Sequence, residues 1–159
     1  MADPVPAQTI SVLIGRIDLT RPPNRLSAVL GSCIGLAIRD QDAYLSGMAH
    51  VLLPASRGEE KPGQPGAYAD RAVPVLVAAL LAHGARRPAL RASMAGGARM
   101  FGHRPEHGLD VGTANRDAVA RALQAAGIPL VFEDCGGGLG RKIHFDPADG
   151  RMVVHALGS

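Results

Sequence analysis

Apolar and polar positions follow two different periods along the chain. Two long segments, 68–83 and 115–126, repeat apolar residues at helical spacing, and each is followed by a glycine, so each is predicted to be a helix. Short apolar runs bounded by Gly, Pro, Asn or Asp predict strands at 9–17, 27–30, 34–39, 45–53, 89–94, 130–133, 141–145 and 151–155. This order of strands, helix, strand, helix and strands is typical of an α+β domain with a mixed sheet.

Two stretches between these elements are predicted to be loops. Residues 55–67 are rich in glycine, proline and charge, and 102–112 form a second such segment. Residues 1–8 contain two prolines and are expected to be flexible. Since no internal repeat or composition change divides the rest, we expect one domain that spans residues 1–159.

Composition narrows the classes of function. The chain has 159 residues, 47% of them hydrophobic but only 3% aromatic, so its core is built from small side chains. The net charge of +3 comes from scattered arginines without a basic run, which argues against nucleic-acid binding. No apolar stretch reaches membrane-spanning length and no signal peptide is recognisable, so we expect a cytoplasmic protein without membrane insertion. In that compartment the two cysteines are expected to be free thiols.

Cys33 and His50 are the residues best placed for chemistry. Cys33 follows an apolar strand through the turn Gly31-Ser32, where freed backbone N–H groups can bind an oxyanion. His50 lies near the end of the strand 45–53, and a tight turn near 40–44 makes the two strands double back. Antiparallel pairing then brings the thiol close to an imidazole that can accept its proton.

Residue type and spacing alone leave a simpler interpretation open. A lone cysteine in an apolar stretch is more often a small buried hydrophobe than a nucleophile. A lone histidine in a strand is likewise more often structural. The Gly-Ser-Cys turn favours the chemical interpretation without establishing it.

A family resemblance strengthens that interpretation. The segments Leu30-Gly31-Ser32-Cys33 and Met48-Ala49-His50 resemble the signature of the CheD family of chemoreceptor glutamine deamidases. The similarity continues, in family order and with family-like spacing, through the segments 68–73, 95–101, 111–115, 133–137 and 140–146. It covers about residues 10 to 157, almost the whole chain.

The resemblance implies a fold, an activity and a set of partners. It implies sandwich-like mixed sheets flanked by two main helices, of cysteine-hydrolase type. The activity is conversion of selected glutamines of methyl-accepting chemotaxis receptors to glutamate, with release of ammonia through a thioester. The family triad maps onto Cys33, His50 and Ser27, with Gly31 and Ser32 at the oxyanion turn. The partners would be the cytoplasmic helical region of those receptors and a CheC-type phosphatase; we expect a monomer that needs no cofactor or metal.

The chain departs from the family pattern at two positions. Ser27 replaces the usual threonine, so it keeps the hydroxyl but loses the methyl group that limits its rotamers. Ala114 stands where many relatives carry arginine, which puts a receptor-docking or loop-anchoring contact in doubt. These departures leave an alternative: a non-catalytic adaptor that binds chemoreceptors and a CheC-type phosphatase. A more remote alternative is an esterase or amidase for a small molecule.

Other reactive residues are given structural roles. Cys135 precedes three glycines where relatives commonly have threonine, and no base is paired with it, so it is expected to be inert. His103 and His107 lie four apart in a loop without acidic or cysteine partners, so no metal site is expected. The glycines at 96–97 and 136–138 lack the spacing of a phosphate-binding loop and are expected to allow close packing beside the active site.

Overall fold

The computed structural model describes residues 6–58, 61–100 and 110–158. The elements of these residues follow one another as β1 Thr9–Ser11, β2 Ile17–Thr20, β3 Arg25–Leu30, β4 Ile34–Asp40, β5 Ser46–Val51, α1 Ala69–Ala82, the 3-10 turn η1 Arg87–Ala89, β6 Leu90–Gly96, α2 Val111–Ala126, β7 Leu130–Cys135, β8 Arg141–Asp146 and β9 Arg151–Ala156. Most of these lie within one or two residues of the predicted elements.

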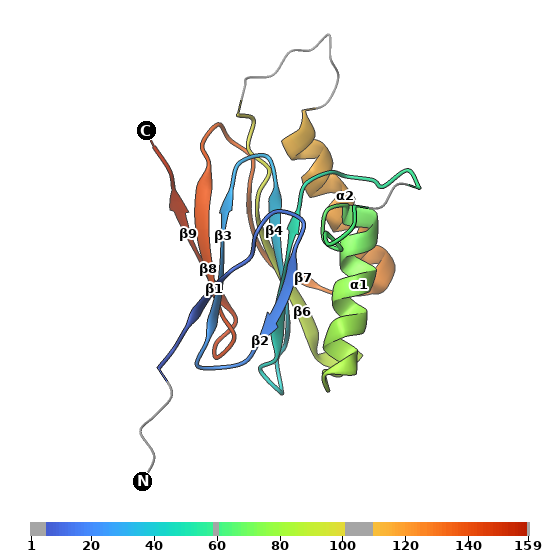
Figure 1. Ribbon diagram of the computed structural model, residues 1–159, viewed down its shortest axis with the longest axis vertical. Helices are drawn as coiled ribbons and strands as arrows, with labels where there is room; N and C mark the ends of the chain where they lie inside the picture. Colours follow the sequence, from blue (N-terminus) through green and yellow to red (C-terminus); the bar gives the residue numbers. More distant parts are fainter. Residues whose placement is uncertain (1–5, 59–60, 101–109, 159) are drawn as a thin grey trace.

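The described strands form two stacked sheets. One has the order β1-β3-β8-β9 and the other the order β2-β5-β4-β6-β7. The pairs β1–β3 and β6–β7 are parallel and the other pairs are antiparallel, so both sheets are mixed. Figure 1 shows α1 and α2 side by side on the outer face of the five-stranded sheet. The predicted α+β architecture, with sandwich-like mixed sheets and two flanking helices, is confirmed.

The central strands of the five-stranded sheet, β5, β4 and β6, are buried on both faces, which explains their nearly continuous apolar runs. In β4 the side chains of Ile34, Leu36 and Ile38 belong to the core beneath the helices. The alternate positions Cys33 and Ala37 belong to a second core between the two sheets. This alternation places Cys33 in the layer between the sheets.

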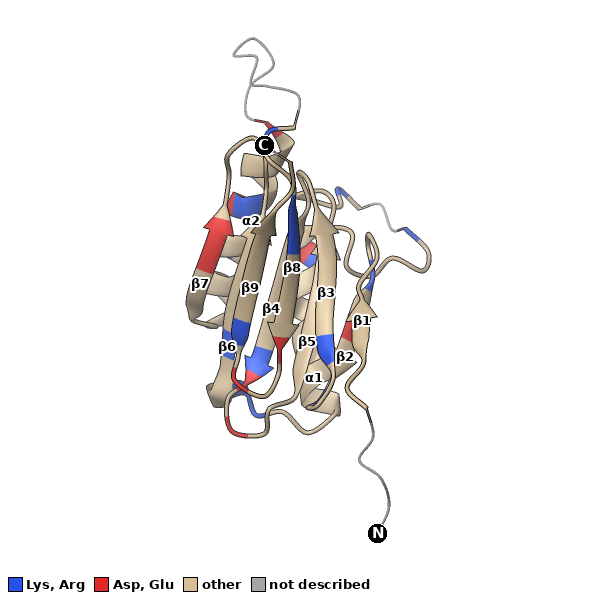
Figure 2. Cartoon of the chain, turned by 90° about the vertical axis from the view of Figure 1, so that its left-hand side faces the viewer, with Lys and Arg blue, Asp and Glu red and all other residues tan. Residues whose placement is uncertain are grey.

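The four-stranded sheet is covered on one face only. Its inward side chains, such as Leu26 and Phe145, fill the layer between the sheets. In the described chain no helix covers its outer face, which Figure 2 presents to the viewer. Exposed residues such as Val29 and Val153 lie on that face, as expected for a sheet with one side in water.

The first predicted strand, residues 9–17, was wrong in one respect. The segment is divided into β1 and β2, which belong to different sheets. A turn closed by the Arg16 N–H on the Leu13 carbonyl, at 2.9 Å, separates them. The composition is strand-like throughout, but the chain crosses from one sheet to the other at this turn.

The second helix begins earlier than predicted, at Val111 instead of residue 115. Asp110 is its N-cap, and the carboxylate of Asp110 accepts the Thr113 backbone N–H at 3.1 Å. Such a side-chain cap satisfies an N–H group that has no partner within the helix. Gly127 ends the helix in the left-handed conformation, as predicted from its position.

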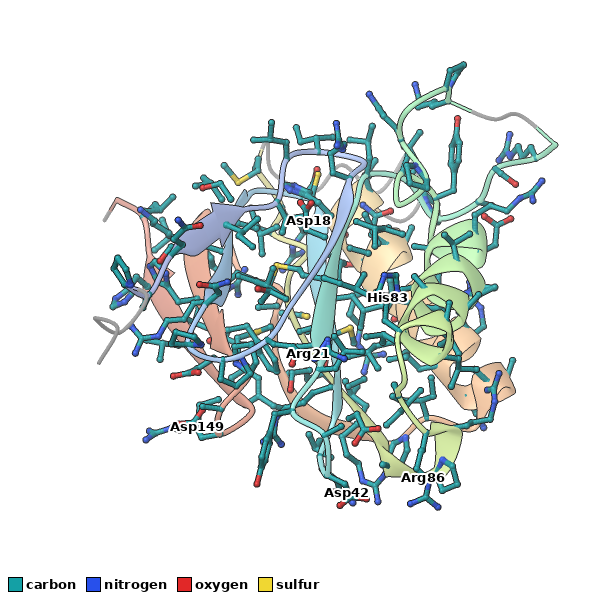
Figure 3. The ribbon with its side chains drawn as sticks, turned by 60° about the horizontal axis from the view of Figure 1, so that its bottom comes forward. Asp18, Arg21, Asp42, His83, Arg86 and Asp149 are labelled. Carbon is teal, nitrogen blue, oxygen red and sulfur yellow. The ribbon has the colours of Figure 1, made fainter. Side chains whose placement is uncertain are left out.

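The turn between β4 and β5 is fixed by the buried carboxylate of Asp40. It accepts the backbone N–H groups of Asp42 and Ala43, each at 2.8 Å, and of Arg86 at 2.8 Å. Figure 3 shows Asp42 and Arg86 close together at this end of the molecule. Burial alone raises the pKa of Asp40, but these hydrogen bonds outweigh it and hold the pKa below its usual range. The tight turn predicted near 40–44 is therefore present and anchored.

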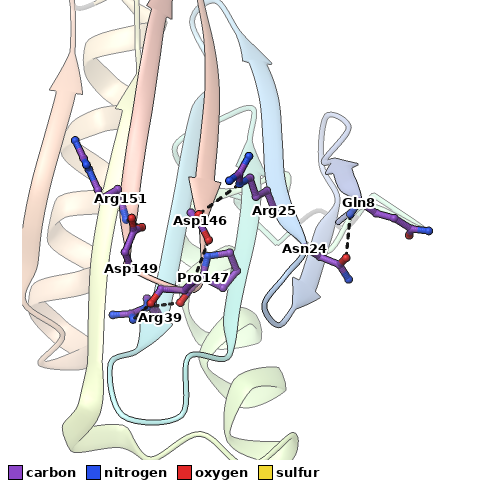
Figure 4. Close-up of polar contacts among 9 residues, drawn as sticks. Gln8, Asn24, Arg25, Arg39, Asp146, Pro147, Asp149 and Arg151 are labelled. Carbon is purple, nitrogen blue, oxygen red and sulfur yellow. Dashed lines mark hydrogen bonds and ion pairs between the residues drawn. The ribbon is translucent and has the colours of Figure 1, made fainter. Parts of the chain in front are cut away.

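The same end of the molecule ties the two sheets together. Arg39 of β4 donates to the Pro147 carbonyl at 2.7 Å, in the turn between β8 and β9 (Figure 4). Arg39 also donates to the Ala148 carbonyl at 3.1 Å. These two bonds fix β4 against the four-stranded sheet at the end opposite Cys33, where Arg25 of β3 pairs with Asp146 of β8 at 3.4 Å within that sheet.

Candidate active site

Cys33 and His50 lie on the same face of neighbouring antiparallel strands. In the β4–β5 ladder Gly35 is opposite His50, and Ile34 is opposite Val51. Cys33 precedes Ile34, so it is diagonal to His50 and shares the face of Gly35, which has no side chain between them. Such diagonal positions are about 7–8 Å apart at the backbone, within reach of long side chains. The predicted juxtaposition of the two strands is confirmed by this register.

The imidazole of His50 is fixed by the backbone of the β1–β2 crossing. Its Nδ1 lies 2.9 Å from the Val12 carbonyl oxygen. Because a carbonyl only accepts, Nδ1 carries the proton and Nε2 is the basic nitrogen. Nε2 is buried and has no hydrogen-bond partner among the described residues. The ring therefore presents a free acceptor inside the protein, as a general base requires.

Burial keeps both reactive groups neutral. Cys33 is 7% exposed and His50 3% exposed. Burial raises the pKa of the Cys33 thiol above its ordinary value of 9.0. Burial also lowers the pKa of His50 below 6.5, and the hydrogen bond to Val12 opposes this only in part. The resting state is thus a neutral thiol and a neutral imidazole, so the thiol proton would have to leave during nucleophilic attack.

The turn before Cys33 packs against the end of β6. The Cys33 carbonyl accepts the Gly97 N–H at 2.9 Å, and the Gly31 carbonyl accepts the Ala98 N–H at 3.0 Å. Gly96 has a φ of +115°, and a Cβ there would overlap the Cys33 carbonyl. Only glycine allows this approach, which agrees with the close packing predicted for the 96–97 segment.

The oxyanion turn has donors available. Among the described residues, no acceptor takes the backbone N–H of Ser32 or Cys33. Gly31 and Ser32 are half-buried, so this side of the thiol is open to the surface. Free N–H groups beside a nucleophile are the usual components of an oxyanion hole. The predicted role of Gly31 and Ser32 stays a prediction that this geometry permits.

Ser27 is placed away from the His50 ring. Its strand neighbours of the same parity, Arg25 and Val29, are exposed, whereas Leu26 and Ala28 face the layer that contains Cys33. The Ser27 hydroxyl lies 3.5 Å from the Ser11 hydroxyl. Since Nδ1 of His50 is bonded to Val12, the orienting hydrogen bond predicted for the Ser27 hydroxyl stays a prediction without a contact to carry it.

Ser27 is nevertheless connected to the imidazole through the backbone. Its carbonyl accepts the Val12 N–H at 2.7 Å, and the Val12 carbonyl in turn binds His50. Sequence reasoning missed Val12, because a backbone carbonyl gives no signal in residue type. The His50 ring is thus held by the Val12 carbonyl, and the Ser27 carbonyl helps to fix Val12.

Asn115 is a second residue that sequence reasoning missed. It is fully buried, and its side-chain N–H₂ donates to the Ser32 carbonyl at 3.0 Å and to the Leu52 carbonyl at 2.9 Å. Its Oδ1 is, with Nε2 of His50, a buried side-chain atom without a partner in the described residues. The sequence signal that could have identified Asn115 is its helical spacing from Ala118 and Val119, which puts it on the apolar face of α2.

The remaining candidates lie apart from this centre. Cys135 is half-buried at the end of β7 and is a free thiol, as is Cys33. His103 and His107 are outside the described residues. Within the part of the chain that the structure describes, no three His, Cys, Asp or Glu side chains are grouped to hold a metal.

A groove of about 790 Å³ is lined by α1 and α2, on the opposite side of the five-stranded sheet from Cys33. It includes Val73, Val77 and Ala118, but neither Cys33 nor His50. The candidate centre is therefore approached at the turn of Gly31 and Ser32, not through that groove. None of the helices in the described ranges is long and apolar enough to cross a membrane.

Comparison with known proteins agrees with these features. Residues 52–156 match the family model described as CheD chemotactic sensory transduction. The chain is 42% identical over 155 residues to a probable chemoreceptor glutamine deamidase CheD of Desulfitobacterium hafniense, with 95% of each chain covered. It is 40% identical over 151 residues to the chemoreceptor glutamine deamidase CheD of Bacillus licheniformis, with 93% of this chain and 90% of the relative covered.

The alignment with a solved structure, that of Bacillus licheniformis hypothetical protein YfiH, covers 72% of this chain and 47% of that chain. Its TM-score of 0.41 and sequence identity of 17% are too low for an inference. The family match and the curated relatives, by contrast, cover most of the chain. The chain belongs to the CheD family.

Proposed function

We propose that this protein is a glutamine deamidase that converts glutamine side chains of methyl-accepting chemotaxis receptors to glutamate. The observation that carries the proposal is the pair formed by Cys33 and His50, on one face of adjacent strands. The names of the relatives supply the reaction and the substrate class. Receptor helices that carry these glutamines would place the reaction in the cytoplasm.

The chemistry follows from the neutral resting state. As Sγ of Cys33 attacks the amide carbon, its proton passes to Nε2 of His50, and an oxyanion forms. The N–H groups of Ser32 and Cys33 would stabilise that oxyanion. The protonated imidazole then gives its proton to the departing nitrogen, so that ammonia leaves and a thioester remains.

The second half of the reaction uses the same groups. His50 removes a proton from water, the hydroxide adds to the thioester carbon, and the C–S bond breaks. The proton on His50 returns to the sulfur, and the product is a glutamate side chain. The hydrogen bond to Val12 stabilises the imidazolium at each stage. These steps need no reactant other than the protein, the glutamine side chain and water.

A side chain on another protein fits the site better than a small molecule. The thiol lies below the half-buried turn of Gly31 and Ser32, and the groove of about 790 Å³ between α1 and α2 is elsewhere. A glutamine amide on a rod of helices can reach such a turn, whereas a small-molecule hydrolase buries most of its ligand in a pocket. This supports the receptor over a free metabolite.

The test is incubation of a receptor cytoplasmic fragment with the protein, followed by mass spectrometry of its peptides. We expect the small mass gain of an amide-to-acid change at defined glutamines, and no gain with Cys33→Ala. An equal gain with the variant would overturn the assignment of the nucleophile. Absence of any gain, together with Cys33-independent binding of the receptor and a CheC-type phosphatase, would instead support the adaptor alternative.

A further inference from the structure

We infer that Asn115 is a positioning residue that holds the thiol of Cys33 and the imidazole of His50 in register. The inference rests on the proposed deamidase function for its activity readout only. It starts from an interruption in the sheet beside the nucleophile, which Asn115 bridges.

The ladder between β4 and β5 stops just before the reactive residues. Its last pair is Ile34 with Val51. In a continued ladder Cys33 would face Leu52 and Ser32 would face Leu53, but the Leu53 N–H donates instead to the Ala67 carbonyl at 2.9 Å. The ladder therefore ends beside the thiol and does not fix the spacing of the two strands there.

The Asn115 carboxamide spans this gap. Its two N–H bonds reach one carbonyl on each strand, that of Ser32 immediately before Cys33 and that of Leu52, two residues after His50. Since both partners are carbonyls, only the nitrogen of the amide can face them, and the orientation of the side chain is settled. One planar group thus replaces the missing ladder bonds.

The helix that carries Asn115 is pressed onto the same place. Gly112, in the first turn of α2, lies against the carbonyls of Gly97 and Ala98, so closely that a Cβ would overlap them. The Gly97 N–H in turn holds the Cys33 carbonyl. The start of α2, the end of β6 and the Cys33 turn therefore form one packed unit.

The same two hydrogen bonds also contribute to the stability of the fold. Asn115 is fully buried, and Asn115→Ala would leave the Ser32 and Leu52 carbonyls without these donors, which lowers stability. A test of the positioning role therefore needs a control variant that is destabilised at least as much but leaves the two strand ends joined.

The first measurement is deamidation kinetics of Asn115→Ala beside Leu123→Ala as a matched control. Leu123 is buried on the same helix, about two turns from Asn115. We expect Asn115→Ala to lower kcat by about 100-fold, since a displacement of about 1 Å costs that much, with KM within about twofold. Leu123→Ala should lower the melting temperature at least as far yet keep kcat. Equal kcat losses in the two variants would overturn the inference.

The second measurement needs no receptor and so separates this inference from the proposed function. At neutral pH the buried thiol of Cys33 depends on His50 to remove its proton, so its alkylation by iodoacetamide reports their alignment. We expect Asn115→Ala to slow alkylation of Cys33 as much as His50→Ala does, and Asn115→Ser, which keeps one donor, to fall between. A wild-type rate in either alanine variant would overturn the positioning role, whether or not the protein deamidates receptors.

Discussion

The two cysteines flank the same residue of β6 and differ in almost every property that governs thiol chemistry. Gly96 pairs with Ile34, next to Cys33, on one side and with Cys135 on the other. Cys33 faces the layer between the sheets, whereas Cys135 packs against the core beneath the helices. The sheet therefore separates two thiols that are close in the ladder.

Their electrostatic surroundings differ as well. Burial raises the pKa of Cys135 to about 12, and the charge of Glu133 adds to the effect while Arg141 and Arg116 oppose it. Burial is the cause at Cys33, and no carboxylate among the described residues adds to it. A neutral imidazole across the ladder can take a proton from Cys33, but Glu133 is tied to Arg116 at 2.7 Å. A neighbouring imidazole, not burial, therefore distinguishes Cys33, the proposed nucleophile, from Cys135.

Replacing each cysteine by alanine is the sharpest test of that comparison. We expect Cys33→Ala to lower deamidation by at least about 1,000-fold, because the thioester cannot form. Cys135→Ala should stay within about twofold of wild type, since its thiol takes part in no step. Mass spectrometry of receptor peptides measures both. Loss of activity in Cys135→Ala with an intact fold would remove the distinction.

Removal of the base should have the next largest effect. We expect His50→Ala to reduce kcat by about 100- to 10,000-fold, the range for loss of a general base. His83→Ala is the control, because that ring lies at the end of α1 and its Nδ1 contacts only the Ala79 carbonyl at 2.8 Å. Steady-state kinetics of the two variants should separate them clearly, and similar losses would contradict the role of His50.

The pH dependence of activity should follow His50. Its pKa lies below 6.5, so the neutral base persists at neutral pH, and kcat/KM should fall about tenfold per unit only below that pKa. The contribution of His50 to folding stability also decreases toward low pH. The imidazole binds protons more strongly in the unfolded chain, so this contribution is fully present above pH 6.5 and is lost as the pH falls through the lowered pKa of the folded state. A rate profile measured at constant ionic strength checks this, and an acid limb above pH 7 would contradict the assignment.

Alkylation should distinguish the thiols by a smaller factor. At pH 9 a thiol with a pKa of about 12 is about one thousandth thiolate, so Cys135 should react very slowly despite its greater exposure. We expect Cys33 to be modified first, by about tenfold or more, even though it is buried. Peptide mapping after iodoacetamide treatment gives both rates. Preferential labelling of Cys135 would show that access outweighs ionisation.

Ser27→Ala should give the smallest effect. The His50 ring is held by the Val12 carbonyl, and the Ser27 hydroxyl points toward Ser11, so we expect kcat within about threefold of wild type. Val29→Ala, on the same outer face, is the matched control. A loss comparable to that of His50→Ala would instead establish the triad role that the family resemblance implies for this hydroxyl.

Much of this site was predictable because its chemistry depends on local pattern. Strand alternation and the turn near 40–44 predicted that the strands of Cys33 and His50 would pair, and the β4–β5 register confirms that pairing. The division of residues 9–17 between two sheets was not predictable, because nothing local distinguishes a strand that continues from one that crosses. The Val12 carbonyl that orients His50 depends on that crossing.

By itself, the sequence determined the hairpin that carries Cys33 and His50 and the two amphipathic helices, and it indicated those two residues as the proposed nucleophile and base. The elements follow from side-chain type and from periods of two and 3.6 residues, which act over short separations. Only the tertiary structure decided that Ser27 faces outward, that a main-chain carbonyl holds the imidazole, and that Asn115 spans the strand ends. The reason is physical: side-chain hydrogen bonds to main-chain carbonyls join residues 38 and 83 positions apart, and no local pattern encodes such pairs.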